Sequence, residues 1–269
     1  MINAKQRLGK KVAVTGKGGS GKTMLTAVML RLFARNENLK VLAIDADSAI
    51  NLPYSLGMKF GKTVGEMRLQ MIEDPSVRAE VKNKHIKTAM AELLEVGDRF
   101  HLLVMGRPEG PGCYCGINEL LKYGIESLSK EYDVTLIDCE AGPEQVNRRV
   151  VQGVDELIIV TDTSSRGIQV AHAISEVGAR DEAKRSGRTS LVINRIKDKG
   201  SQIADMAHQQ CGLEVIGLIP EDENITKYDL IGEPLIELPD TSPSVLAVQE
   251  ILERIGLFDS LSNTGNDST

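Results

Sequence analysis

The chain has 269 residues, of which 41% are apolar and 26% are charged, and its formal net charge is −6. These values exclude bulk disorder and a fibrous fold, and they allow one large domain or two small ones. The acidic balance and an aromatic content of 3% without Trp argue against a nucleic-acid-binding protein. No apolar stretch approaches the roughly 18 residues of a membrane span, and the N-terminus lacks a signal-peptide core. We therefore expect a cytoplasmic protein.

Short apolar runs alternate with helical patterns along the chain. The runs expected to form strands are Lys11–Thr15, Lys40–Ile44, Phe100–Met105, Asp133–Asp138, Glu156–Thr161, Ser190–Asn194 and Glu214–Ile219. The helical patterns lie at Thr23–Arg35, Gly116–Tyr132, Gly167–Ala179, Ser201–Gln210 and Ser242–Ile255. Continuous apolar strands separated by helices are typical of strands buried on both faces. The pattern predicts a single-domain α/β fold with a doubly wound, mainly parallel sheet flanked by helices.

Two segments differ from this alternation. Residues 61–97 are polar, Met-rich and helical in pattern, and we interpret them as a helical insertion. Residues 259–269 are rich in Ser, Asn, Asp and Gly, which predicts a disordered tail. This tail has no apolar stripe that could anchor the protein to a membrane. The folded domain is accordingly expected to span residues 1–258.

A glycine-rich segment between the first strand and the first helix predicts a phosphate-binding loop. It reads Gly16-Lys17-Gly18-Gly19-Ser20-Gly21-Lys22-Thr23 and has the Gly-x-x-x-x-Gly-Lys-Ser/Thr pattern. Its glycines let backbone amides close around a phosphate, and the helix N-terminus adds a positive dipole. We expect Lys22 to reach the terminal phosphates and the Thr23 hydroxyl to bind Mg²⁺.

A second lysine, Lys17, directly follows the first glycine of this loop. It cannot easily reach the phosphates held by its own loop, but it can reach the nucleotide of a facing subunit, as an arginine finger does in trans. The loop that carries Lys17 resembles the deviant Walker A motif of the MinD/ParA-type P-loop ATPases, and the resemblance runs from Lys11 to about Leu257. It implies an ATP-hydrolysing homodimer with nucleotide sandwiched between the subunits, in which Lys17 crosses the interface.

Carboxylates at the ends of two strands are expected to line the same site. Asp45 and Asp47 follow the second strand, and residues at this spacing can both turn toward the mouth of a parallel sheet. The resemblance implies that Asp45 supports the Mg²⁺ shell and that Asp47 positions the attacking water. The apolar run that ends in Asp138 resembles Walker B, which implies that Asp138 lies on the water shell of the metal.

Two segments late in the chain resemble the base-binding parts of these ATPases. Asn194 ends a late strand at the place of the purine-binding asparagine. A GTPase would need Asp at position 197 to pair with guanine, and Lys197 there favours ATP. The segment Pro220-Glu221-Asp222 resembles the loop on the adenine side, with backbone contacts expected. The same three residues also form a routine turn before a helix.

Cys113 and Cys115 form a Cys-x-Cys pair flanked by glycines. Two thiolates cannot complete a tetrahedral metal site, but the two-fold axis of a dimer doubles them. Four sulfurs suit Zn²⁺, an iron–sulfur cluster or square-planar Ni²⁺. The simpler alternative is a pair of cysteines buried in a turn, and we expect Cys139 and Cys211 to be interior residues of that kind.

The Cys-x-Cys segment resembles the CooC-type ATPases, which serve nickel insertion into carbon monoxide dehydrogenase. This implies a metallochaperone whose homodimer, promoted by ATP, metal or both, carries Ni²⁺ or Zn²⁺ to a client nickel enzyme, with no nucleic acid or membrane partner. One alternative is an ATP-gated electron donor with a 4Fe–4S cluster, related to the nitrogenase iron protein. That protein has a second cluster cysteine where this chain has Gln145, so a direct nitrogenase-reductase interpretation fails. Another alternative is a MinD/ParA-like positioning ATPase.

Overall fold

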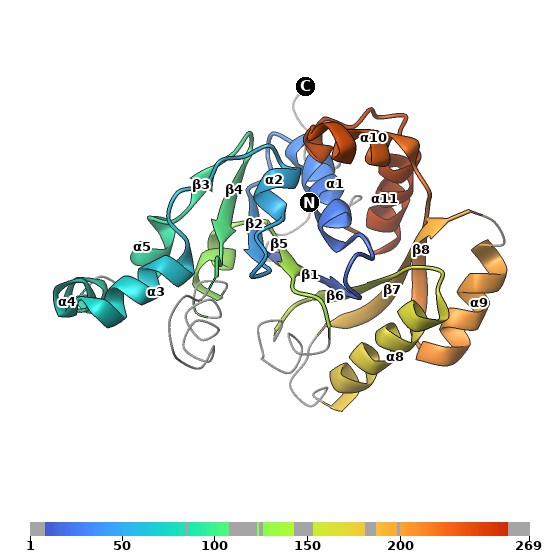
Figure 1. Cartoon of the computed structure of the whole chain (residues 1–269), viewed down its shortest axis with the longest axis horizontal. Coiled ribbons are helices and arrows are strands. Elements are labelled where there is room, and N and C mark those ends of the chain that lie inside the picture. The colour runs from blue at the N-terminus through green and yellow to red at the C-terminus, as the bar shows by residue number, and fades with distance from the viewer. Residues whose placement is uncertain are drawn as a thin grey trace, which may run out of the picture.

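A sheet of eight strands forms the centre of the computed structural model, which describes residues 9–83, 86–107, 123, 126–142, 153–180, 187–197 and 200–257 (Figure 1). The strands are β1 (Lys10–Gly16), β2 (Val41–Ala46), β3 (Glu95–Val96), β4 (Phe100–Val104), β5 (Val134–Cys139), β6 (Glu156–Thr161), β7 (Arg188–Ile196) and β8 (Glu214–Pro220). Their order is β3-β4-β2-β5-β1-β6-β7-β8. Within this sheet β3 pairs antiparallel with β4, and the other neighbours pair in parallel. The expected mainly parallel α/β sheet is confirmed.

Each of the seven expected strands forms, within two residues of its expected bounds. The addition is β3, which extends the sheet beyond β4 from the end of the polar segment 61–97. β1 lies between β5 and β6 in the middle of the sheet. The carboxyl ends of these three strands therefore meet where the strand order reverses, and this crevice is where ligands bind in open α/β sheets.

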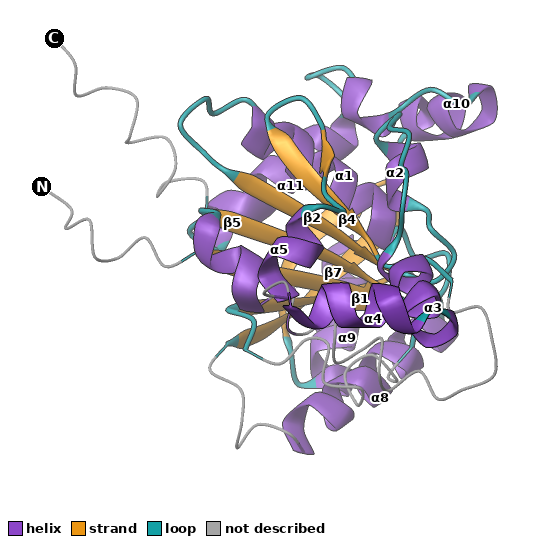
Figure 2. Ribbon diagram, turned by 90° about the vertical axis from the view of Figure 1, so that its left-hand side faces the viewer, coloured by secondary structure: helices purple, strands orange, loops and turns teal. Residues whose placement is uncertain are grey.

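Helices cover both faces of the sheet (Figure 2). One face is covered by α1 (Lys22–Ala34), α2 (Leu52–Ser55), α10 (Glu223–Ile231), the short 3₁₀ helix η4 (Leu235–Glu237) and α11 (Pro243–Arg254). The opposite face packs against α3 (Val64–Glu73), α4 (Pro75–Asn83), α5 (Ile86–Ala91), α8 (Ser165–Arg180) and α9 (Gly200–Cys211). Among the described helices, none is both long and apolar enough to cross a membrane.

The helix that follows the glycine-rich loop is buried almost all round. Ten of the thirteen residues of α1 are buried, which is typical of a helix enclosed on every side. It packs against the sheet on one side and against α11 and η4 on the other. Because this packing holds the helix rigidly, the loop at its N-terminus has a fixed position.

The helix expected at Gly116–Tyr132 lies largely outside the described residues. Its described end is helical at residues 126–128 and then tightens into the 3₁₀ turn η2 (Ser129–Glu131). Cys113 and Cys115, with the metal site expected for them, also lie outside the described residues.

Candidate nucleotide-binding site

The glycine-rich loop joins β1 to α1 in a conformation that requires glycine. Gly16 has φ 148° and lies against β6, where a Cβ would come within 2.0 Å of the Val160 carbonyl oxygen. Gly21 has φ 100°, and a Cβ there would lie 2.1 Å from Nδ2 of Asn194. A side chain at either position is both strained and sterically blocked. The loop is therefore held tightly against two neighbouring strands.

Hydrogen bonds close the loop on itself. The Ser20 amide and the Lys22 ammonium both donate to the Lys17 carbonyl oxygen, at 3.2 Å and 3.3 Å. Lys22 is buried, so its charge is held within the loop. At the start of α1, Gly21 supplies no side-chain cap. The first amides of this helix and the ammonium together form a cradle for an anion of the size of a phosphate.

Asp45 and Asp138 are directly opposite each other on β2 and β5. Ala43 and Leu136, two residues earlier in each strand, pack in the core on the α1 side, so both carboxylates point to that face. Both aspartates are fully buried. The sheet register therefore holds two carboxylates side by side beneath the N-terminus of α1.

Burial changes the proton affinity of both carboxylates. Burial and the neighbouring Asp138 carboxylate raise the pKa of Asp45 to about 8. Burial also raises the pKa of Asp138 to about 7, although the Thr23 hydroxyl and the Lys22 ammonium oppose the shift. Neither oxygen of Asp138 has a partner at ordinary hydrogen-bond geometry in the described part of the chain, even though Thr23 is close enough to influence its pKa. A cation bound beside these groups would favour their charged form.

These residues fit a magnesium ion. Mg²⁺ is usually held by one or two carboxylates together with substrate phosphates. Asp45, Asp138 and the Thr23 hydroxyl would hold it here, and when bound it would neutralise phosphate charge. The described residues contain no group of three or more His, Cys, Asp or Glu side chains that could hold a metal ion on its own. A site completed by nucleotide agrees with that finding.

Asp47 lies in a tight turn directly after β2. Its amide donates to Oδ1 of Asp45 at 3.0 Å, and its own Oδ1 accepts from the Ala49 amide at 2.9 Å. The other Asp45 oxygen accepts from the Leu52 amide at 3.1 Å, at the start of α2. Asp45 thus fixes the segment that carries Asp47, and it brings the expected water-positioning residue to the mouth of the sheet.

Asn194 braces the glycine-rich loop. Its Nδ2 donates to the Ser20 carbonyl oxygen at 2.8 Å, and its Oδ1 accepts from the Arg195 amide at 2.8 Å. The end of β7 is therefore tied to the phosphate cradle across 174 positions of sequence. The expected purine contact of Asn194 stays a prediction, since the described contacts are with the protein itself.

The segment Pro220-Glu221-Asp222 ends β8 and leads into α10. Asp222 caps α10 by accepting from the Asn224 amide at 2.9 Å, and it also accepts from the Ser244 amide at 2.9 Å and from the Ser242 hydroxyl. Burial opposes ionisation of this carboxyl, but these hydrogen bonds prevail and lower its pKa. The Asp222 side chain therefore joins the starts of α10 and α11. The adenine contacts expected from the backbone of this loop stay a prediction.

Lys17 makes a contact that sequence reasoning missed. Its ammonium lies 2.7 Å from Oδ2 of Asp162 in the same chain. Asp162 directly follows β6, the strand paired with β1 next to the glycine-rich loop. A carboxylate after an apolar strand was the available signal, since the same pattern drew attention to Asp45 and Asp138.

Cys139 and Cys211 are interior residues, as expected. Cys139 packs on the sheet face opposite to Asp138, and burial raises the pKa of its thiol. The Cys211 thiol donates to the Ile168 carbonyl oxygen at 3.6 Å. Neither thiol belongs to the nucleotide site.

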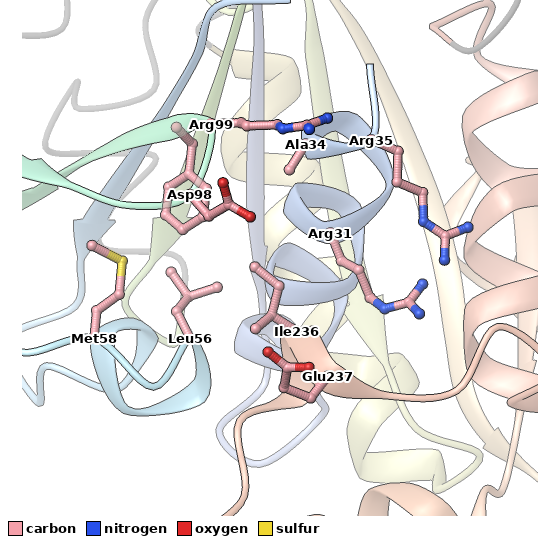
Figure 3. Close-up of a pocket in the computed structure, with 10 residues that line it drawn as sticks. Arg31, Ala34, Arg35, Leu56, Met58, Asp98, Arg99, Ile236 and Glu237 are labelled. Atoms are coloured by element: carbon pink, nitrogen blue, oxygen red, sulfur yellow. The ribbon is translucent and has the colours of Figure 1, made fainter. Parts of the chain in front are cut away.

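A separate cavity of about 380 Å³ lies at the C-terminal end of α1, bordered by Arg31, Arg35 and Arg99 (Figure 3). Arg31 and Arg35 both pair with Asp240, and Arg99 pairs with Glu37 at 2.8 Å. Asp98 and Glu237 also line the cavity, so four carboxylates surround the three arginines. The cavity has no excess positive charge for an anion, and it lies at the opposite end of α1 from the glycine-rich loop.

Three relatives resemble the chain over nearly its whole length. An uncharacterized ATP-binding protein of Methanocaldococcus jannaschii is 38% identical, with 91% of this chain and 97% of the relative covered. The carbon monoxide dehydrogenase accessory protein CooC of Rhodospirillum rubrum is 29% identical, with the same coverage of each. The septum site-determining protein MinD of Synechocystis is also 29% identical, with 91% and 88% covered.

The family model of the CobQ/CobB/MinD/ParA nucleotide-binding domain matches residues 11–235. That range contains the glycine-rich loop, the buried carboxylates and the loop at the end of β8. The chain therefore belongs to the CobQ/CobB/MinD/ParA nucleotide-binding domain family, and it is an ATPase.

Proposed function

We propose that this ATPase is a nucleotide-switched homodimer that acts as a metallochaperone. It binds Ni²⁺ or Zn²⁺ as cargo through Cys113 and Cys115 of both subunits and supports nickel insertion into an enzyme of the carbon monoxide dehydrogenase type. The observation that carries this proposal is the Cys-x-Cys pair on an ATPase scaffold. The likeness to a carbon monoxide dehydrogenase accessory protein supports it.

The nucleotide site has a defined division of roles in this proposal. The backbone of Gly16 to Thr23 and the Lys22 ammonium bind the phosphates, while Asp47 orients the attacking water. Lys17 enters the site of the partner subunit and stabilises charge on the transferred phosphoryl group. The preformed cradle and the confined ammonium of Lys22 support these assignments.

The remaining residues bind the metal and the base. Thr23, Asp45 and Asp138 hold Mg²⁺, and the support for this is the pair of buried carboxyl groups, whose raised pKa values a bound cation would lower. Asn194 and the backbone at residues 220–222 contact the adenine. Binding of ATP closes the two subunits, and hydrolysis lets them separate. The four thiolates of the closed dimer then lose the arrangement that holds the metal.

The decisive experiment measures bound metal and oligomeric state together. Protein prepared anaerobically is loaded with Ni²⁺ or Zn²⁺, with and without Mg·ATP, and compared with a Cys113→Ser/Cys115→Ser variant. Cys211→Ser is the matched control, because a serine hydroxyl can keep the hydrogen bond to Ile168. One metal per dimer that is lost only in the double variant would support the metallochaperone. Four irons with sulfide would replace it with the electron donor.

A second candidate is a positioning switch of the MinD/ParA kind. It is favoured by the MinD relative, which is as similar to this chain as CooC is. In that case ATP would drive dimerisation while neither metal nor the two cysteines would matter. ATP-dependent dimers without bound metal, unchanged in the Cys113→Ser/Cys115→Ser variant, would therefore favour this candidate and contradict the metallochaperone proposal.

A further inference from the structure

The Lys17–Asp162 pair joins the glycine-rich loop to the start of α8. The ammonium and the carboxylate oxygen are 2.7 Å apart, and 27% and 18% of the two side chains are exposed. This distance is that of a charge-assisted hydrogen bond. Partial burial reduces the screening that weakens exposed ion pairs. The contact therefore holds the side chain of Lys17 within its own subunit.

Asp162 is oriented for this contact by its neighbours. Its Oδ1 accepts from the amide and the hydroxyl of Ser164, which leaves Oδ2 for Lys17. A Cβ on Gly167 would lie only 2.3 Å from Oδ1, so the first turn of α8 leaves just enough space for the carboxylate. Burial opposes ionisation, but Lys17 and Ser164 prevail and lower the pKa of Asp162. The carboxylate is thus charged and fixed before any ligand binds.

The sheet sets the position of both partners. Gly16 lies opposite Val160 in the β1–β6 ladder, so Lys17 follows one strand and Asp162 closely follows the other. The absence of a side chain at Gly16 permits this close approach. Since both strands lie in the middle of the sheet, each partner is attached to the end of a rigid strand.

We propose that Asp162 is a positioning residue that holds Lys17 in the separated subunit and releases it when two subunits close over ATP. The inference rests on the proposed role of Lys17 in the partner's site. The ammonium then exchanges the Asp162 carboxylate for the γ-phosphate bound by the partner. Because that phosphate carries more negative charge than a carboxylate, the exchange favours closure with ATP. Asp162 thereby opposes closure when no γ-phosphate is present.

The test compares dimer dissociation constants of four chains: the native one, Asp162→Asn, Lys17→Ala and the double variant. Asparagine keeps the Oδ1 acceptor for Ser164 and replaces Oδ2 by a group that cannot pair with an ammonium. Dimerisation is measured by sedimentation with Mg²⁺ and a non-hydrolysable ATP analogue. Asp162→Asn frees one lysine in each of the two subunits. Each lost ion pair should lower the dimer dissociation constant about threefold, so the loss of both should lower it about tenfold.

The control is Asp155→Asn, which alters a carboxylate at the other end of β6 that pairs with Lys10 and the Lys11 amide. It should leave the dimer constant unchanged. In the Lys17→Ala background, where no dimer is expected, Asp162→Asn should not restore dimerisation. Ser164→Ala keeps both charges but removes one hydrogen bond to Asp162, so it should tighten the dimer less than Asp162→Asn does. Melting temperatures of the separated subunits identify any variant that fails to fold.

Whether Asp162→Asn raises or lowers the dimer dissociation constant decides between keeping and rejecting the proposed role of Asp162. A weaker or unchanged dimer in folded Asp162→Asn, with Lys17→Ala still preventing dimerisation, would overturn the role of Asp162 and leave the nucleotide switch intact. Native protein that stays monomeric with the analogue, or Lys17→Ala protein that dimerises like the native chain, would overturn both proposals.

Discussion

Asp138→Asn should make the nucleotide-free protein lose less stability than the native chain does as the pH rises, at the expense of its activity. Burial raises the pKa of Asp138 from 3.8 to about 7. A shift of this size corresponds to at most about 4 kcal/mol of lost stability once the pH exceeds the folded pKa. The change to asparagine removes this charge and also relieves Asp45, whose pKa the Asp138 carboxylate helps to raise.

The direction in which stability changes with pH follows from proton binding. Between the unfolded pKa of 3.8 and folded values of about 7 and about 8, the folded state binds more protons than the unfolded state. The free energy of unfolding must therefore fall as the pH rises through this window. The stabilising effect of the protonated carboxyls is fully present below the unfolded pKa and is lost above the folded pKa.

Urea denaturation at about pH 5 and about pH 8 tests this linkage. The native chain should lose stability between the two values, and Asp138→Asn should lose less, because only Asp45, whose pKa burial still raises, titrates there. The buried amide of asparagine brings a fixed cost of about 1–3 kcal/mol that does not change with pH. Mg·ATP should stabilise the native chain at the higher pH and not the variant. Parallel pH profiles for the two proteins would refute the account of the buried carboxylates.

Three further substitutions test other parts of the site. Gly21→Ala places a Cβ 2.1 Å from Nδ2 of Asn194, so ATP binding measured by calorimetry should be lost; near-native affinity would contradict the tight cradle. Asp222→Ala removes three hydrogen bonds to a charged, buried carboxylate and should lower the free energy of unfolding by about 3 kcal/mol with little change in ATP affinity. A large loss of ATP affinity in a variant of native stability would instead indicate that the Asp222 side chain contacts the adenine. Thr23→Ala should reduce Mg²⁺-dependent ATP hydrolysis at least about 100-fold in a folded protein, as phosphate-release assays can check.

The fold was largely readable from the sequence because its signals are local. Buried parallel strands appear as continuous apolar runs, and the loop that starts at Gly16 lies between such a run and a helix. The edge strand β3 has only two residues, and Val96 in it is 77% exposed, so no periodic pattern could predict it. The strand order was not predictable either, since it depends on contacts between distant segments.

The site, like the fold, was predictable where the sequence signal is local and not where it depends on contacts between distant residues. Asp45 and Asp138 are recognisable from the strands that they end, and the register of β2 and β5 then brings them together. The contacts of Lys17 with Asp162 and of Asn194 with Ser20 join positions 145 and 174 residues apart. No rule based on sequence spacing predicts contacts between residues so far apart in the chain. The sequence therefore indicated which groups carry charge, whereas the structure shows which of them are already paired.

Because Lys17 is already paired with Asp162 in the nucleotide-free subunit, the steps of the proposed cycle should occur in a fixed order. The nucleotide-free subunit has a preformed cradle and two buried carboxyl groups with raised pKa values, and its Lys17 is engaged by Asp162. Mg·ATP relieves the carboxylates within one subunit, so it can bind before any partner arrives. Release of Lys17 needs a stronger anion than Asp162, and a γ-phosphate on the facing subunit supplies it. Closure should therefore follow nucleotide binding, and subunits that hold ADP should keep Lys17 on Asp162 and stay apart.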